Sequence, residues 1–263
     1  MKRNLVVLVG LALLALASWA SGPATPVPEY MPYCSSPQDI APLQAAGGSQ
    51  VNTRSDVVWN GKDYAVAWVD SADSRLHFRR FFADGTPAGA VVTPSALIPY
   101  GDSPSLVWNG SGYGVAWAAL SPSTNWQIYF ARLDANGALV GSEVKASFVG
   151  LGETVGCLAP SLTWSGSGYA VAWYDFRNPT YDIFATLLNA DGTVANAGAS
   201  HDLVLSNAVN TQYVPSVAWS KGAGRYKVVW EDYRSGTHYE VWGASLTPAG
   251  AITADGIALV SGA

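Results

Sequence analysis

The chain has 263 residues, of which 13% are charged and 12% are aromatic, and its formal net charge is −5. This length suffices for one domain with a substantial core, while the negative charge disfavours binding to the phosphate backbone of nucleic acids. High counts of Trp (11), Tyr (13) and Gly (27) are typical of a β-rich protein with many turns.

Residues 1–20 predict a secretory signal peptide. Lys2 and Arg3 form a positive n-region, residues 5–17 are apolar, and Ser18-Trp19-Ala20 supplies the small residues of a cleavage site. The apolar run is shorter than the roughly 20 residues that a membrane-spanning helix needs. We therefore expect cleavage after Ala20, export to the periplasm or the extracellular space of a bacterium, and no membrane span.

Residues 21–51 are rich in Pro, Ser and Gly and predict a lead-in segment, with one short strand at 40–46. This segment contains Cys34, and the other cysteine of the chain is Cys157. An even number of cysteines in an oxidising compartment permits a disulfide, which would fasten the lead-in to the domain. Neither cysteine has His or Cys close by in sequence, so we expect no metal site and no cofactor.

Residues 52–263 predict four copies of a repeat of roughly 50 residues. The copies start near residues 55, 104, 160 and 215, and each contains a strand ending in Trp, a turn with Gly and a Tyr-x-Val-x-Trp strand. Two further apolar stretches complete each copy, and in three copies Asp-Gly or Asn-Gly closes the hairpin between them. Each copy therefore predicts a four-stranded antiparallel sheet, and no segment predicts a helix.

The Tyr-x-Val-x-Trp strand predicts how the copies pack. Its large residues alternate with small ones such as Ala170 and Ala172, so each sheet has a bulky face and a flat face. We expect each bulky face to pack on the flat face of a neighbouring copy all the way round, as in a β-propeller of four blades. An open β-solenoid and two packed sandwiches are the alternatives. Lys227 and Val229 replace the small residues in the fourth copy, which predicts a looser contact or an exposed edge there.

The third copy carries a resemblance to a known family. Its sequence 164–177, followed by Asp182-Ile183-Phe184 and Asp191-Gly192, resembles the repeat of TolB-type, WD-repeat-like bacterial propellers. The resemblance extends over residues 52–263, but the Pro-Asp of the family's first turn is missing, and the second copy has Ala118-Ala119-Leu120 in place of Asp-x-Arg. It implies an exported scaffold that binds proteins or ligands and has no catalytic residues.

The longer loops lie at one end of such a propeller, where function tends to concentrate. Trp126, in a loop of the second copy, is a candidate for stacking on a ligand. The other candidate ligand-binding residues at this end are polar: Asp175, Arg177, Asp182, Asp232, Arg234, His238 and Glu240. The recurrence of Asp-x-Arg in two copies also fits a structural role, in which each pair ties down its own loop.

The sequence contains no Gly-x-Ser-x-Gly elbow, P-loop or His-Glu-x-x-His motif. We therefore expect a non-catalytic binding or scaffold module whose partner is a protein or a glycan. A carbohydrate-active hydrolase or lyase is an alternative, because its carboxylates need only meet in space. A purely structural repeat protein is another, since fold alone does not choose among these functions.

Overall fold

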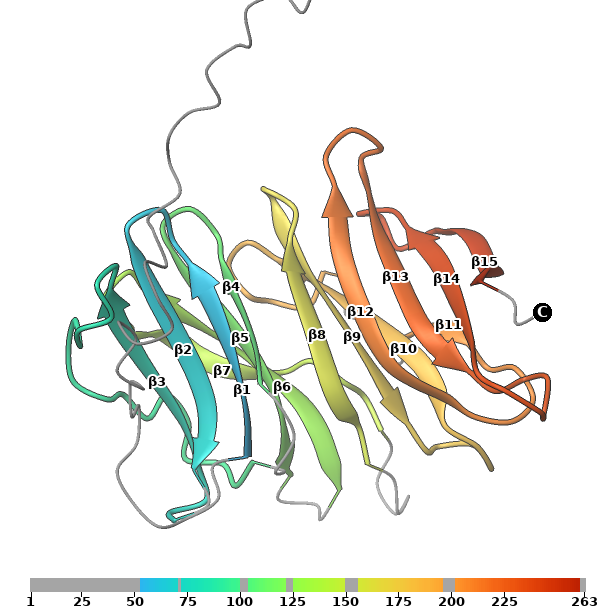
Figure 1. Cartoon of the computed structure of the whole chain (residues 1–263), viewed down its shortest axis with the longest axis horizontal. Coiled ribbons are helices and arrows are strands. Elements are labelled where there is room, and N and C mark those ends of the chain that lie inside the picture. Colours follow the sequence, from blue (N-terminus) through green and yellow to red (C-terminus); the bar gives the residue numbers. More distant parts are fainter. Residues whose placement is uncertain are drawn as a thin grey trace, which may run out of the picture. The chain divides into compact units, whose positions relative to one another are not determined.

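The computed structural model describes residues 53–70, 72–99, 104–121, 125–149, 156–195 and 202–260. Their strands form four antiparallel sheets, which confirms the predicted all-β propeller with four blades. Figure 1 shows the sheets side by side in chain order. The predicted signal peptide and the lead-in with its strand at 40–46 lie outside the described residues.

Each sheet forms one blade, with strands adjacent in sequence paired to each other. Blade 1 consists of β1 (Thr53–Trp59), β2 (Asp63–Asp70) and β3 (Arg75–Phe82). Blade 2 consists of β4 (Ser105–Trp108), β5 (Gly112–Leu120), β6 (Trp126–Asp134) and β7 (Leu139–Lys145). Blade 3 consists of β8 (Leu158–Trp164), β9 (Gly168–Asp175), β10 (Asp182–Asn189) and β11 (Leu203–Ser206). Blade 4 consists of β12 (Gln212–Ser220), β13 (Arg225–Asp232), β14 (Glu240–Leu246) and β15 (Ile252–Val260).

Blade 1 has three strands, although the sequence predicts a fourth at 90–93. In its place, Val92 and Phe78 exchange two backbone hydrogen bonds of 2.8 Å. A second isolated bridge joins Pro87 to Phe81, in a register that differs from the Phe78–Val92 bridge, and Pro94 follows the predicted stretch directly. Because proline has no N–H to donate, the ladder does not extend far beyond Val92.

The first turn of each repeat joins neighbouring blades. Asn60 Oδ1 accepts the backbone N–H of Asp63 (2.7 Å), which stabilises the turn, and Asn60 Nδ2 donates to the Tyr113 hydroxyl of blade 2 (2.7 Å). Asn109 repeats this contact, since its Nδ2 donates to the Tyr169 hydroxyl of blade 3 (2.6 Å). The Asn of the Trp-Asn-Gly sequence therefore closes its own hairpin and also anchors the tyrosine of the next blade.

The first strands of successive blades are joined by hydrogen bonds from backbone to side chain. Leu106 N–H donates to Asp56 (2.7 Å), Leu162 N–H to Ser105 (3.0 Å), and Val217 N–H to Ser161 (3.0 Å). Asp56, Ser105 and Ser161 occupy equivalent positions in the repeat. Equivalent hydrogen bonds therefore hold the first strands of neighbouring blades in the same relative position at all three interfaces.

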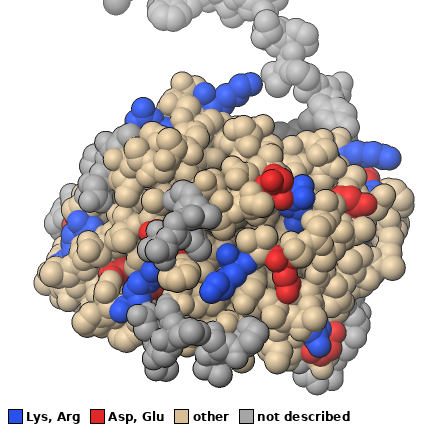
Figure 2. Space-filling view, turned by 180° about the vertical axis from the view of Figure 1, so that it is seen from behind, with Lys and Arg blue, Asp and Glu red and all other residues tan. Residues whose placement is uncertain are grey.

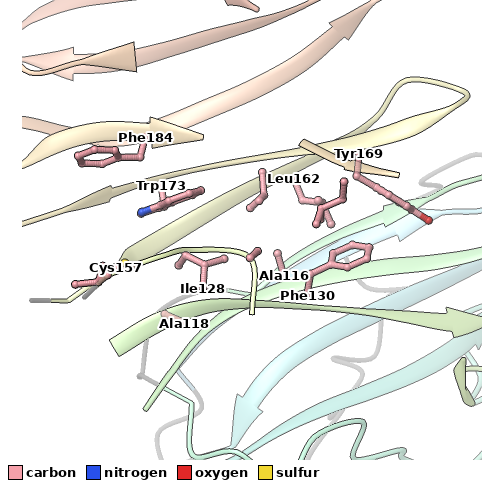
Figure 3. Packing of buried hydrophobic residues seen from close by; sticks show 13 residues of the cluster. Ala116, Ala118, Ile128, Phe130, Cys157, Leu162, Tyr169, Trp173 and Phe184 are labelled. Carbon is pink, nitrogen blue, oxygen red and sulfur yellow. The ribbon is translucent and has the colours of Figure 1, made fainter. Parts of the chain in front are cut away.

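The core lies between the blades, where bulky faces pack on flat faces as predicted. Figure 3 shows the cluster between blades 2 and 3, in which Tyr169 and Trp173 of β9 lie over Ala116 and Ala118 of β5. All four residues are buried. Equivalent clusters join blade 1 to blade 2 and blade 3 to blade 4. A single sheet could not bury its aromatic residues alone, so the blades stabilise one another.

The bulky face of blade 1 departs from this pattern. Tyr64 is 41% exposed, whereas the equivalent Tyr113 and Tyr169 are fully buried and Tyr226 is 2% exposed. Among the described residues, this face therefore lacks the cover that the other three have, and the expectation of packing all the way round was wrong here. On blade 4, the half-buried Lys227 stands on the flat face in a position that holds a buried alanine or glycine in the other blades.

Gly137, in the Asn-Gly turn of blade 2, offers a test of this packing. A Cβ added there would lie 2.4 Å from Phe78 Cε1 of blade 1, and Gly137 has a φ of +92°. We expect Gly137→Ala to lower the free energy of unfolding by about 1–2 kcal/mol through backbone strain and by a further ~1–3 kcal/mol through overpacking. Urea unfolding would measure both.

Gly110→Ala is the matched control, because Gly110 has a φ of +99° and no atom within 4 Å of an added Cβ. It should show the strain alone. Equal losses in the two variants would contradict the close approach of Gly137 to Phe78.

Candidate functional site

The connections β2–β3, β5–β6, β9–β10 and β13–β14 lie at one end of the sheets, which we call the long-loop end (Figure 1). At this end of blade 3, Asp175 is fully buried and heavily hydrogen-bonded. Arg177 donates to it from Nε (2.9 Å) and from an NH2 group (2.5 Å), and Trp173 Nε1 donates to it at 3.0 Å. These charge-assisted bonds compensate the buried carboxylate and fold the loop back on its strand.

Blade 4 repeats this arrangement. Arg234 donates to the buried Asp232 at 2.9 and 2.6 Å, and Trp230 Nε1 donates at 2.9 Å. Burial opposes ionisation, but the hydrogen bonds from Arg234 and Trp230 outweigh it and lower the pKa of Asp232. We call Asp175–Arg177 and Asp232–Arg234 the two clamps.

Each clamp arginine also lies over an aromatic ring of the next strand. The guanidinium carbon of Arg177 is 3.8 Å from the centre of the Phe184 ring, and that of Arg234 is 3.4 Å from Trp242. Such cation–π contacts hold both arginines in place. The recurrence of the whole arrangement indicates that the clamp residues have a structural role at this end of the propeller.

Blades 1 and 2 lack the clamp. In blade 2, Ala119 occupies the position of the clamp aspartate, and the buried Nε1 of Trp117 has no hydrogen-bond partner. The buried Nε1 of Trp68 in blade 1 also has none. The missing Asp-x-Arg of the second copy therefore leaves a buried indole unsatisfied, which costs stability.

Two further aspartates lie beside the clamp of blade 3. Asp202 pairs with an NH2 group of Arg177 at 2.7 Å and accepts the backbone N–H of Phe148 at 3.0 Å. Asp182 is directly opposite Asp175 in the β9–β10 register. Burial raises the pKa of Asp182, and the charge of Asp175 adds to this effect. No local motif marks Asp202, so sequence reasoning missed it.

Cys157 lies on the other side of Asp175. Its thiol is buried and donates to Asp175 Oδ2 at 3.6 Å, and burial, followed by the charge of Asp175, raises its pKa. The expected disulfide partner, Cys34, lies outside the described residues, so the pairing of Cys34 with Cys157 stays a prediction. The buried protonated thiol is a hydrogen-bond donor and a poor nucleophile.

Trp126 begins β6 and is half-buried, so its expected place in a loop was wrong. Its carbonyl accepts the backbone N–H of Cys157 at 3.0 Å, and its side chain packs against Gly156. Trp126 and Gly156 form a parallel β-bridge, which extends the edge of blade 2 toward the clamp of blade 3. Trp126 therefore lies near Asp175 as part of the packing there.

In blade 4, Glu240 is opposite Asp232 in the β13–β14 register. Its Oε2 accepts Trp242 Nε1 at 2.9 Å, and its Oε1 is 3.4 Å from His238 Nε2. The side chain of Glu240 is 13% exposed and that of His238 is 46% exposed. The predicted polar residues thus form two groups, one in each of blades 3 and 4, and only the blade 4 group includes acid–base side chains open to solvent.

A row of aromatic rings, which sequence reasoning did not single out, continues along the same end. Tyr181 lies 5.0 Å from Phe176, 5.3 Å from Tyr174 and 5.1 Å from Tyr213 between ring centroids. Tyr213 is 6.4 Å from Tyr239, which is 4.9 Å from Tyr233. We call these six residues the aromatic row: Phe176, Tyr181, Tyr174, Tyr213, Tyr239 and Tyr233. Their positions in loops and at strand ends were the available signal.

Within the described ranges, His, Cys, Asp and Glu side chains form no group of three or more that could hold a metal ion. Nor does any helix in those ranges have the length and hydropathy of a membrane span.

No family model and no curated protein matches this chain. Among solved structures, it is similar to an α-L-arabinanase of Penicillium chrysogenum complexed with arabinobiose, with 14% identity over 81% of this chain and 68% of that one, and a TM-score of 0.53. An endo-arabinase from Bacteroides thetaiotaomicron has 12% identity over 80% and 82% of the two chains, with a TM-score of 0.52. A thermostable family-43 glycoside hydrolase has 11% identity over 82% and 75%, with a TM-score of 0.51.

These similarities correct two expectations. The predicted relationship to TolB-type, WD-repeat-like propellers was wrong, because the three similar structures named above are glycoside hydrolases. The expected non-catalytic binding or scaffold module is corrected by the same finding. At this level of identity the similarity establishes the β-propeller fold, and the chemistry must be argued from the residues of this chain.

Proposed function

We propose that this protein is a carbohydrate-active hydrolase that cleaves glycosidic bonds at the long-loop end of blade 4. The observation that carries the proposal is the opposed pair of carboxylates, in which Asp232 is fully buried and the side chain of Glu240 is 13% exposed. Glycoside hydrolysis generally uses two carboxyl groups in different environments. The fold shared with arabinanases and a family-43 hydrolase supports this function over a non-catalytic one.

The environments of the two carboxylates suggest their roles. Asp232 is held ionised by Arg234 and Trp230, so it supplies a fixed negative charge that favours positive charge developing on a sugar ring. Glu240 is the candidate acid–base residue, which donates a proton to the leaving oxygen and takes one from water. His238 is placed to share a proton with Glu240. The predicted signal peptide is consistent with a substrate outside the cytoplasm.

We expect Glu240→Gln to lower the rate of polysaccharide hydrolysis by about 100-fold, because general acid–base catalysis contributes on that order or more. The assay is release of reducing ends from linear arabinan and xylan, chosen because similar structures are arabinanases and a family-43 hydrolase. The isosteric change keeps the hydrogen bond from Trp242.

Asp182→Asn is the matched control, since Asp182 holds the equivalent place in blade 3 but is 1% exposed. It should leave the rate largely unchanged. If the folded wild type releases no reducing ends from any substrate, or if Asp182→Asn is the variant that loses activity, this assignment is wrong.

A further inference from the structure

The aromatic row points to the kind of glycan that this site would take. Phe176 is 43% exposed and Tyr239 is 53% exposed, while the rings between them are half-buried. The row crosses from the end of β9 and the start of β10 to the start of β12 and the β13–β14 loop, and so spans blades 3 and 4 at the long-loop end (Figure 1). A row of packed aromatic rings with two exposed members of this kind typically marks an interaction site.

The packing within the row holds its exposed rings in fixed positions. Tyr174 meets Tyr181 and Tyr213 edge to face, at interplanar angles of 81° and 89°. Edge-to-face contact is the favoured geometry for such pairs and limits ring motion. Phe176 and Tyr239, at or near the two ends, are therefore pre-ordered, so a ligand that covers them loses little conformational entropy on binding.

The chemistry of the row suits a sugar chain better than an aliphatic partner surface. Five of the six rings carry a phenolic hydroxyl, which both donates and accepts hydrogen bonds. The rings of Tyr213 and Tyr233 lie 6.4 and 4.9 Å from that of Tyr239 between centroids. Desolvation, followed by the charges of Tyr213, Glu231 and Tyr233, raises the pKa of Tyr239. Rings that offer an apolar face and polar edges match the apolar faces and hydroxyl edges of sugar rings.

The charges around the row indicate a neutral glycan. The exposed carboxylate is Glu231, next to Tyr239, and the two nearby arginines are compensated by their clamp aspartates. Charged side chains are also sparse and scattered on the face of the molecule in Figure 2. An acidic polysaccharide would meet Glu231 without a free cation in the row to offset it.

We propose that the aromatic row binds an extended, neutral polysaccharide across blades 3 and 4 and presents it to Glu240. This inference rests on the proposed hydrolase function for the orientation of the chain toward Glu240. Binding itself requires no turnover, so the two proposals can fail separately. Tyr239 directly precedes Glu240 in sequence, which places one end of the row beside the acid–base candidate.

The test is affinity gel electrophoresis of the full chain in gels that contain linear arabinan, xylan, mixed-linkage β-glucan or, as the acidic comparison, polygalacturonate. We expect at least one neutral polysaccharide to retard the wild type and polygalacturonate not to do so. Tyr239→Ala should weaken retardation by about 2- to 10-fold, the equivalent of one aromatic contact. Tyr239→Phe, which keeps the ring, should retain most of the binding.

Tyr64→Ala is the matched control, because Tyr64 is 41% exposed and packs on Trp59 of blade 1, outside the row. Its retardation should equal that of the wild type. The inference is overturned if no neutral polysaccharide retards the folded wild type, if polygalacturonate binds more tightly than the neutral chains, or if Tyr64→Ala weakens binding as much as Tyr239→Ala. Binding without hydrolysis would overturn the hydrolase function and leave the row as a glycan-binding surface.

Discussion

Replacement of Arg177 by Met should lower the free energy of unfolding by about 3–5 kcal/mol. Arg177 compensates two carboxylates, Asp175 and Asp202, whose side chains are 0% and 1% exposed. Without the guanidinium, both buried negative charges would lose the cation that they share, and that loss is strongly unfavourable. Methionine keeps much of the aliphatic packing of the arginine stem, so the loss reports the charge. Urea unfolding followed by Trp fluorescence measures it.

Arg234→Met in blade 4 provides the comparison. Arg234 pairs with one carboxylate, Asp232, and a guanidinium NH2 group also donates to the hydroxyl of Ser206 at 3.3 Å. Its loss should therefore be smaller than that of Arg177→Met. Adding Asp202→Asn to Arg177→Met should recover part of the stability, because one buried charge is removed. Equal losses at the two arginines, with no recovery in the double variant, would disprove the assignment of Arg177 as a shared counter-ion.

The second large effect is expected at Tyr169. Its ring is fully buried between blades 2 and 3, 4.8 Å from Phe130 and 4.5 Å from Trp164. Its hydroxyl also accepts the hydrogen bond from Asn109. Truncation of a buried aromatic residue costs about 3–5 kcal/mol, so Tyr169→Ala should destabilise the protein by that amount.

Tyr64→Ala tests the equivalent tyrosine of blade 1, which is not buried against another blade as Tyr169 is. Tyr64 is 41% exposed, so we expect a loss of about 1 kcal/mol or less. Chemical unfolding of both variants under identical conditions gives the comparison. Similar losses would mean that the bulky face of blade 1 is covered as well as the other three, contrary to the structure.

The fold could be predicted from the sequence because the same pattern of strands and turns recurs four times. The alternation in Tyr-x-Val-x-Trp predicted both the strand and the two unlike faces. The third apolar stretch of the fourth copy, at residues 240–246, was predicted as a strand and matches β14. The predicted fourth strand of blade 1 was wrong because the pairing with β3 shifts register between the Phe81–Pro87 and Phe78–Val92 bridges, and because Pro94 has no N–H to extend the ladder past Val92.

The site was accessible only in part. The clamps were visible because Asp-x-Arg recurs at one place in two repeats, which also pointed to their structural role. Asp202 and the aromatic row were not, because their contacts join residues far apart in sequence: Arg177 to Asp202, and Tyr174 to Tyr213. The mistaken family resemblance arose from turn and strand motifs that any propeller blade of this length can share.

The repeated contact between blades also bears on how such a chain can evolve. Each internal interface joins the same two faces through a backbone-to-Asp or backbone-to-Ser bond, and the first two interfaces add the same Asn-to-Tyr bond. A duplicated copy of blade 2 inserted after blade 2 would therefore meet a complementary surface on both sides without new mutations. A copy added after blade 4 would instead place its tyrosine on Lys227. Internal duplication is thus the easier route to a longer array.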